Sequence, residues 1–178
     1  PPRSTLFPYT TLFRSDFLFS QSLTLLSAEP FTGKTMFLLA MMASLDTFEP
    51  LCGQFLPLRE GLQRDKIYAP NPHVLFIGQD APTWDYKGQY QKLLRGLIGD
   101  ADPPSTHSRF LLNTGIDILD PQFPAWIEQA LYYTDCHTIM LDTFLDMHDR
   151  DENSNREMKP VMKMLKHLRD KQIGRAHV

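Results

Sequence analysis

The sequence predicts an α/β domain built around a mostly parallel β-sheet, because short apolar runs alternate along the chain with amphipathic stretches of helical spacing. Two further observations support this class. A Gly-Lys-Thr tripeptide, Gly33 to Thr35, stands between an apolar run and a helix-forming run, and a later apolar run ends at the carboxylate of Asp142. Residues at the ends of the apolar runs are therefore the first candidates for chemistry.

The two ends of the chain differ from the rest. Residues 6–15 and 173–178 resemble translated adapter oligonucleotides from short-read DNA library preparation. We therefore predict that residues 1–15 and 173–178 are processing scars outside the fold. Residues 16–172 then form one domain, which is long enough to bury a sizeable core. We expect this core to be incomplete on its C-terminal side, which would leave apolar surface exposed.

Composition and charge narrow the class further. Hydrophobic residues make up 42% of the chain and charged residues 22%, which is ordinary globular usage. A net charge of −3 and an isoelectric point near 6.1 argue against a uniformly basic face for nucleic acid. A ring-shaped motor can nevertheless concentrate positive charge on short loops in a central channel. Cys52 and Cys136 form no metal-binding pattern and indicate reduced cytosolic thiols. No apolar run approaches the roughly 20 residues that cross a bilayer, so we expect a cytoplasmic protein without a membrane partner.

The first chemical landmark is the segment around Gly33. We predict a strand over residues 23–27 and a helix over residues 34–45, with a tight loop between them. This layout is typical of a nucleotide-binding P-loop, in which backbone N–H groups and the helix N-terminus hold the phosphates. The Lys34 ammonium would reach the terminal phosphate oxygens, and the Thr35 hydroxyl would ligate Mg²⁺. The predicted nucleotide contacts are Glu29, Pro30, Phe31, Thr32, Gly33, Lys34, Thr35 and Met36.

One residue departs from the P-loop pattern. The opening glycine of the pattern is replaced by Ala28, which fits the turn if its φ is negative. The alternative interpretation of this segment is a polar turn that caps an ordinary core helix.

The second apolar run predicts a strand over residues 73–78, and Asp80 follows it. In one branch of P-loop ATPases, a carboxylate at the end of the strand beside the P-loop strand orients the attacking water. Asp80 is therefore the candidate catalytic base, and its alternative role is to cap the next helix. A long polar connection over residues 46–72 precedes this strand and is predicted to contain a short helix over residues 58–64.

The next helix is predicted over residues 84–98, and its aromatic stripe is assigned to the core rather than to base stacking. A polar loop over residues 99–108 leads to a weaker third strand that begins with residues 110–112. Asp120 is expected to cap the following helix, with Pro121 at its first position. The residues expected to face inward are Tyr86, Tyr90, Leu93, Leu94 and Leu97 in the first helix and Trp126, Ile127, Ala130 and Leu131 in the second.

Asp142 ends the fourth apolar run, which predicts a strand over residues 137–142. A buried strand that ends in a carboxylate is how P-loop ATPases place the Walker B acid beside magnesium. The alternative role of Asp142 is to cap the following turn. The acidic stretch over residues 146–156 is predicted to be a solvated loop. A helix over residues 156–171 follows, in which Pro160 fits only the first turn and the outward lysines form a solvated face.

Three stretches, residues 27–35, 74–82 and 139–144, together resemble the RepA-type hexameric helicase ATPases of the RecA-like P-loop class. The resemblance implies a three-layer RecA-like core that binds ATP and Mg²⁺ through Lys34 and Thr35. It also implies that Asp142 is the Walker B acid and that Asp80 matches the catalytic glutamate of the family. The residues that match the His-x-x-x-Glu-Asn-like stretch after Walker B are His148, Glu152 and Asn153.

The same resemblance implies partners. Proteins of this family form rings that use ATP turnover to move along single-stranded DNA. We therefore expect a DNA-dependent motor of replication or repair. It would be a homo-oligomer, as a hexameric ring, and its partner would be single-stranded DNA.

The sequence leaves three other functions open. A regulatory ATPase of the same fold would bind ATP to assemble partners without unwinding DNA. A small-molecule P-loop kinase would carry an arginine-bearing lid, and the late part of the chain shows no arginine cluster. Ala28 and Asp80 also leave open a degenerate P-loop that binds nucleotide without turnover.

Overall fold

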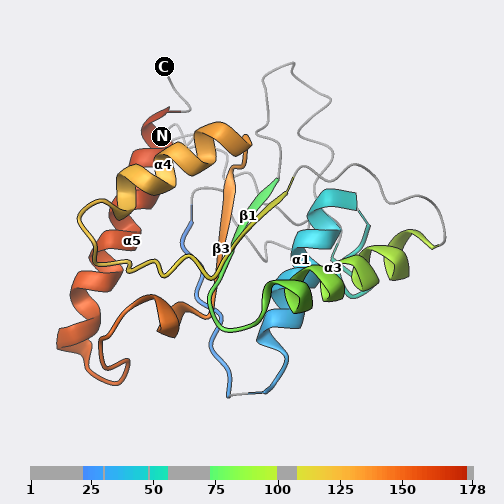
Figure 1. The fold of residues 1–178 in the computed structure, drawn as a ribbon, viewed down its shortest axis with the longest axis horizontal. Helices are drawn as coiled ribbons and strands as arrows, with labels where there is room; N and C mark the ends of the chain where they lie inside the picture. Colours follow the sequence, from blue (N-terminus) through green and yellow to red (C-terminus); the bar gives the residue numbers. More distant parts are fainter. Residues whose placement is uncertain (1–21, 30, 48, 56–72, 100–107, 176–178) are drawn as a thin grey trace, which may run out of the picture.

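The fold is given by a computed structural model, which describes residues 22–29, 31–47, 49–55, 73–99 and 108–175. Within these ranges, helices and strands alternate along the chain as the sequence predicts (Figure 1). The elements are α1 (Lys34–Thr47), β1 (Val74–Gly78), α3 (Thr83–Ile98), β2 (Arg109–Leu112), α4 (Phe123–Thr134), β3 (Thr138–Asp142), the 3-10 turn η1 (Phe144–Met147) and α5 (Asn155–Arg175). The helix expected over residues 58–64 lies outside the described residues.

The described strands form a parallel sheet in the order β2-β1-β3. Parallel neighbours need crossover connections, and helices α3 and α4 supply the two crossovers from β1 to β2 and from β2 to β3. The register pairs Gly78 at the end of β1 with Leu112 on one side and Asp142 on the other. All three strands therefore end at the same edge of the sheet.

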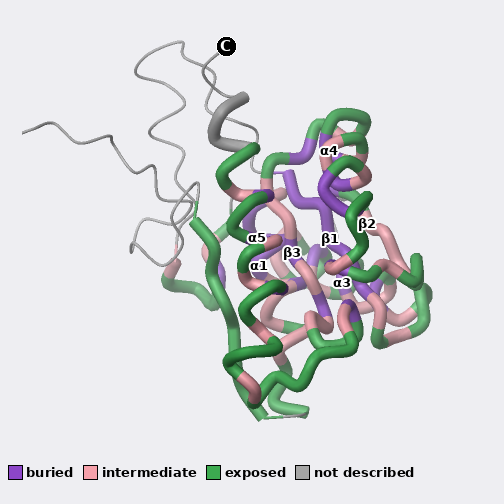
Figure 2. Tube along the Cα trace, turned by 90° about the vertical axis from the view of Figure 1, so that its left-hand side faces the viewer, coloured by how far each residue is buried: buried purple, intermediate pink, exposed green. Residues whose placement is uncertain are grey.

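The central strand β1 is buried on both faces, and its alternate residues face different helices. Val74 and Phe76 pack with apolar residues of α1 and α3. Leu75 and Ile77 pack with those of α4, η1 and α5, and Figure 2 shows this buried interior around β1. A strand that is covered on both faces has a continuous run of apolar residues in its sequence, as residues 74–77 have. The structure thus confirms the predicted three-layer α/β class with a parallel sheet.

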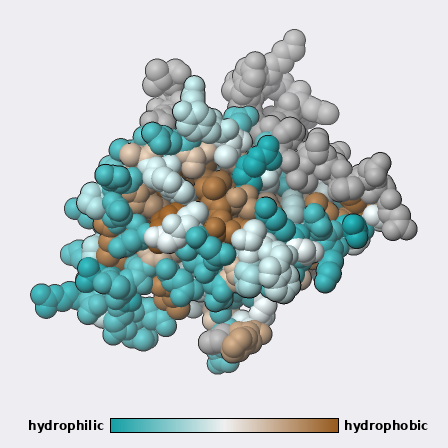
Figure 3. All heavy atoms as spheres, viewed as in Figure 1, coloured by the Kyte–Doolittle hydropathy of each residue, from teal (hydrophilic) through white to brown (hydrophobic). Residues whose placement is uncertain are grey.

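The predicted first strand is wrong in the structure. Residues 22–29 form no regular element and are exposed, with Leu25 65% and Leu26 41% accessible. A strand exists only through its ladder and its cross-strand pairs, and no described strand forms a ladder with this segment. The outer edge of β3 therefore has no strand partner in the described sheet. Figure 3 shows apolar side chains near the middle of this view, where Figure 1 places β3 and β1.

Two helix starts also differ from the sequence-based expectation. Helix α4 begins at Phe123 with Gln122 as its N-cap residue, whereas Asp120 forms a turn in front of it. The Asp120 carboxylate accepts a hydrogen bond from the Gln122 N–H at 2.7 Å, and its carbonyl accepts one from the Phe123 N–H at 2.9 Å. Aspartate favours such local turns over a helix start. The prediction that Pro121 occupies the first helical position is therefore wrong, whereas the inward positions Ile127 and Leu131 are confirmed.

Helix α5 begins at Asn155, which places Pro160 in its second turn rather than the expected first turn. A proline there supplies no N–H to the carbonyl of Arg156. Both residues are exposed, so water can satisfy this carbonyl. The solvent-facing position explains why the helix continues through the proline.

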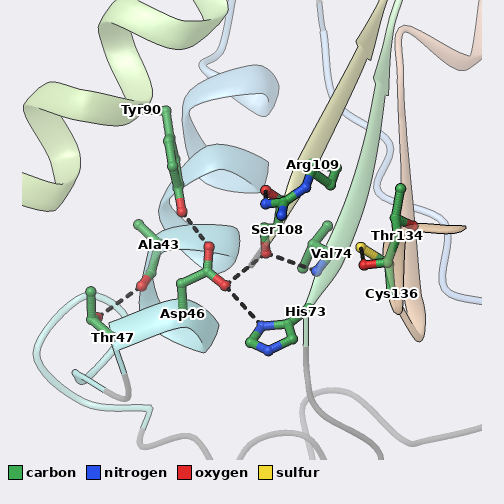
Figure 4. Close-up of polar contacts among 10 residues, drawn as sticks. All are labelled: Ala43, Asp46, Thr47, His73, Val74, Tyr90, Ser108, Arg109, Thr134 and Cys136. Carbon is green, nitrogen blue, oxygen red and sulfur yellow. Dashed lines mark hydrogen bonds and ion pairs between the residues drawn. The ribbon is translucent and has the colours of Figure 1, made fainter. Parts of the chain in front are cut away.

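A buried carboxylate joins the elements at the amino end of β1. Asp46, on the last turn of α1, is only 1% exposed in its side chain and accepts hydrogen bonds from the Tyr90 hydroxyl and, at 2.7 Å, from the Ser108 hydroxyl. The His73 ring nitrogen Nδ1 lies 3.4 Å from the same carboxylate. Ser108 in turn accepts the Val74 N–H at 2.8 Å (Figure 4). This Asp46 cluster therefore ties α1, α3 and the beginnings of β1 and β2 together.

We predict that Asp46→Ala lowers the free energy of unfolding by about 2–4 kcal/mol, because it removes the acceptor of two buried hydroxyl groups. Urea unfolding measures this change. The matched control is Glu49→Ala, which removes an exposed carboxylate three residues further along the chain. Equal losses in the two variants would show that the cluster does not hold the elements together.

Candidate functional site

The candidate site begins where β1 and β3 end. Gly78 pairs with Asp142, and the next residue, Gln79, donates its backbone N–H to the Asp142 carbonyl at 2.9 Å. On the other side, the Asn113 N–H donates to the Gly78 carbonyl at 2.8 Å. These hydrogen bonds continue the ladder one step beyond the strands. The segments that carry Asp80 and Asp142 are therefore held next to each other.

The loop before α1 closes on itself through polar contacts. The Thr32 hydroxyl donates to the Glu29 carbonyl at 2.7 Å, and the Lys34 ammonium donates to the carbonyls of Ala28 and Glu29 at 2.6 and 2.7 Å. Helix α1 then begins, with the Phe37 N–H bound to the Gly33 carbonyl at 2.9 Å. Two neutral carbonyl groups of the loop thus bind the lysine ammonium. A negatively charged phosphate would bind this ammonium more strongly than the carbonyl groups do.

The backbone conformation of this loop accommodates Ala28. The positive φ values of the described loop residues fall at Phe31 (62°) and Gly33 (90°), and Ala28 is not among them. The condition under which alanine can replace the usual glycine is therefore met. Phe31 is strained by its positive φ and its side chain is fully exposed, so it lies at the tip of the loop. Pro30, another predicted contact, lies outside the described residues.

Asp142 is the centre of the site. Asp142 is only 4% exposed, and this burial raises the pKa of its carboxyl group. Hydrogen bonding from the side chains of Thr35 and Tyr86 lowers the same pKa, the charge of Asp80 raises it, and the charge of Lys34 lowers it. The structure therefore brings Lys34, Thr35 and Asp80 around one buried carboxylate.

The residues around Asp142 fit a magnesium ion. The carboxylate oxygen Oδ2 is buried and has no hydrogen-bond partner among the described residues, so one acceptor is left for a ligand. The Thr35 hydroxyl offers a second oxygen, and oxygen ligands together with phosphate oxygens are what Mg²⁺ prefers. Neither here nor elsewhere among the described residues do three or more His, Cys, Asp or Glu side chains gather to hold a metal ion.

Asp80 is exposed at the end of β1. The N-cap residue of α3 is Pro82, and no side chain makes a capping hydrogen bond there. The alternative that Asp80 caps this helix is therefore wrong. The side chain of Asp80 is instead free to face a ligand at the edge of the sheet, close enough for its charge to raise the pKa of Asp142.

Sequence reasoning missed two residues of this site. Tyr86, which was assigned to the apolar core, also places its hydroxyl 3.4 Å from the Asp142 carbonyl. The Gln79 side-chain oxygen accepts the Gly115 N–H at 3.2 Å, whereas its nitrogen Nε2 is buried without a partner in the described part of the chain. The available signal was the polar group of each residue, since a buried tyrosine or glutamine needs a partner that phenylalanine or leucine does not.

The fold defines this protein as an α/β protein with a parallel sheet covered by helices on both faces. A family model described as an AAA domain matches residues 7–178, so the chain belongs to the AAA domain family of P-loop ATPases. No curated protein and no solved structure matches the chain. In the part of the chain that the structure describes, no helix has the length and apolar character to cross a membrane.

We predict that Asp142→Asn stabilises the nucleotide-free protein by roughly 1 kcal/mol at neutral pH. The raised pKa means that folding penalises the ionised carboxyl group, and the amide removes this penalty. The gain shrinks as the pH falls through the raised pKa, because the wild-type carboxyl group is then neutral as well.

Urea unfolding between about pH 8 and about pH 4 measures this dependence. Asp149→Asn, an exposed aspartate, serves as the control. A loss of stability in Asp142→Asn at neutral pH would contradict the assignment of a desolvated charge.

Proposed function

We propose that this protein hydrolyses ATP with Mg²⁺ at the site around Asp142 and uses the turnover as a RepA-like oligomeric motor on single-stranded DNA. The observation that carries the ATPase part is the gathering of Lys34, Thr35 and Asp80 around a buried carboxylate with an unpartnered oxygen. A loop at a helix N-terminus lies beside the ends of parallel strands, which is where α/β proteins bind phosphates.

The residues have separate roles in this proposal. Lys34 exchanges the carbonyls of Ala28 and Glu29 for phosphate oxygens, and the backbone N–H groups at the start of α1 face the same phosphates. Thr35 and Asp142 hold Mg²⁺. When bound, this ion neutralises charge on the phosphate oxygens.

Asp80 is proposed as the group that orients the attacking water. Its carboxylate stands at the end of β1, beside Asp142, and makes no capping contact with α3. A base in this position can take the proton of the water as the water attacks the terminal phosphate. The side chain of Asp80 is one methylene shorter than that of the glutamate in the resembled family. The rate of hydrolysis therefore depends on how closely the Asp80 carboxylate approaches the attacking water.

The motor part of the proposal rests on the order and spacing of the three resembling stretches, residues 27–35, 74–82 and 139–144. The strands of the second and third stretches end at the same edge of the sheet, and Thr35 of the first stretch lies close to Asp142 there. The resembled proteins act as hexameric rings, in which residues of a neighbouring copy complete the nucleotide site. A homo-oligomer with single-stranded DNA in a central channel is therefore the proposed working form.

One observation favours a second candidate function, an ATP-binding switch with little turnover. The residue that follows β1 directly is Gln79, whose amide cannot take up a proton, and the carboxylate of Asp80 is exposed one residue later. A site with a weak base binds ATP but hydrolyses it slowly. In the switch, Asp80→Ala changes neither ATP binding nor the low rate of hydrolysis, whereas in the motor it lowers turnover.

We predict steady-state ATP hydrolysis that requires Mg²⁺, rises severalfold with single-stranded DNA and falls at least about tenfold in Lys34→Ala, since the ammonium is the charge that holds the terminal phosphate. Lys87→Ala, which removes an exposed ammonium of α3, is the matched control. ATP binding without turnover, with or without DNA, would exclude the motor and leave the switch.

A further inference from the structure

Tyr86 lies in the second turn of α3, between the two carboxylates of the site. Tyr86 is only 1% exposed, and the centroid of its ring lies 5.4 Å from that of Phe76 in β1. Its hydroxyl lies 3.4 Å from the carbonyl oxygen of Asp142. The ring is therefore fixed by packing, and its polar end points at the end of β3.

Gly78 makes room for this ring. A Cβ atom at Gly78 would lie 2.8 Å from Cζ of Tyr86, the carbon that carries the hydroxyl, and 2.8 Å from the Leu112 side chain. Real Cβ atoms do not approach a ring this closely, so any larger residue at this position would displace the tyrosine. Gly78 is also the residue that pairs with Asp142 across the sheet. The absence of a side chain at this position lets the hydroxyl reach the strand end.

The hydroxyl group of Tyr86 is buried among polar groups of the site. Burial, followed by the nearby charge of Asp142, raises the pKa of Tyr86 to about 12. Hydrogen bonding from the backbone N–H groups of Ala81 and Asp80 lowers this pKa. One oxygen atom thus faces the backbone that carries Asp80 and the residue Asp142 on the next strand.

We propose that Tyr86 is a positioning residue of the nucleotide site, whose hydroxyl holds the backbone of Asp142, and with it the carboxylate, at the place that receives the metal ion. This inference rests on the proposed role of Asp142 as a metal ligand. Asp142 is a buried carboxylate with one unpartnered oxygen, and its position is set on one side by the β1 pairing and on the other by Tyr86. Without the hydroxyl, the Asp142 carbonyl loses a donor, and the end of β3 that carries the carboxylate is held less firmly.

The same helix provides a matched control. Tyr90 lies one turn further along α3 and is buried to a similar extent, and its hydroxyl also donates to an aspartate, here to the carboxylate. That carboxylate is Asp46, in the cluster at the amino end of β1 (Figure 4). Tyr86→Phe and Tyr90→Phe therefore remove the same atom from the same helix, one near the nucleotide site and one away from it.

The test measures the binding of Mn²⁺, as a spectroscopic substitute for Mg²⁺, to the full chain with ATP, by the electron paramagnetic resonance of free Mn²⁺. We expect Tyr86→Phe to weaken Mn²⁺ binding severalfold, as loss of one hydrogen bond to a neutral carbonyl does. We expect Tyr90→Phe to leave Mn²⁺ binding unchanged and to lower stability instead. Urea unfolding of both variants separates the two effects.

Two further variants make the outcomes distinct. Asp142→Ala should abolish Mn²⁺ binding, so that the signal of free Mn²⁺ rises, and unchanged binding would overturn the proposed role of Asp142 itself. If Asp142→Ala abolishes binding while Tyr86→Phe binds Mn²⁺ like the wild type, the positioning role of Tyr86 is wrong. Gly78→Ala, which pushes on the ring, should reproduce the weakened binding of Tyr86→Phe. Equal weakening in Tyr86→Phe and Tyr90→Phe would reduce the effect to general loss of packing.

Discussion

The pairing of Gly78 with Asp142 is the constraint on which the rest of the structure depends. A shift by one residue in this parallel register would turn every side chain of β3 to the other face of the sheet and would move Asp142 away from the end of β1. The backbone hydrogen bond from Gln79 to the Asp142 carbonyl extends the register beyond the strands. The apolar residues of β1 fix the same register from within, because they pack alternately on the two helical layers.

The buried carboxylate of the proposed nucleotide site lowers the stability of the nucleotide-free protein. Asp142 carries a carboxylate into the interior, and its Oδ2 atom finds no partner among the described residues. Buried polar groups without partners are uncommon in proteins and occur where a ligand completes them. At the other end of β1, the Asp46 carboxylate is also buried, but it is satisfied by two hydroxyl groups. Helix α3 contributes a tyrosine to each of these two aspartates, to the backbone carbonyl of Asp142 and to the carboxylate of Asp46, so one helix supports both ends of the central strand.

Local sequence patterns predicted the parts of this structure that depend on local chemistry. The apolar run of β1, the helical spacing of α3 and the carboxylate at the end of β3 are each visible within a few residues. The strand predicted over residues 23–27 failed because a strand needs a partner, and no pattern within that run shows whether one is present. Asp120 misled the prediction because an aspartate that closes a turn looks the same in sequence as one that caps a helix. Asp46 and Ser108 meet across sixty-two positions of sequence, and a contact of that kind leaves no mark in spacing.

The central claim is that three separate segments, the loop before α1, the residues after β1 and the end of β3, form one nucleotide site. Hydrogen exchange of the backbone amides, compared with and without Mg²⁺ and a non-hydrolysable ATP analogue, tests this claim most directly. The account predicts that the analogue slows exchange in residues 31–36, 79–82 and 142–144 together. Protection confined to the loop before α1, or found only in other segments, would contradict the account.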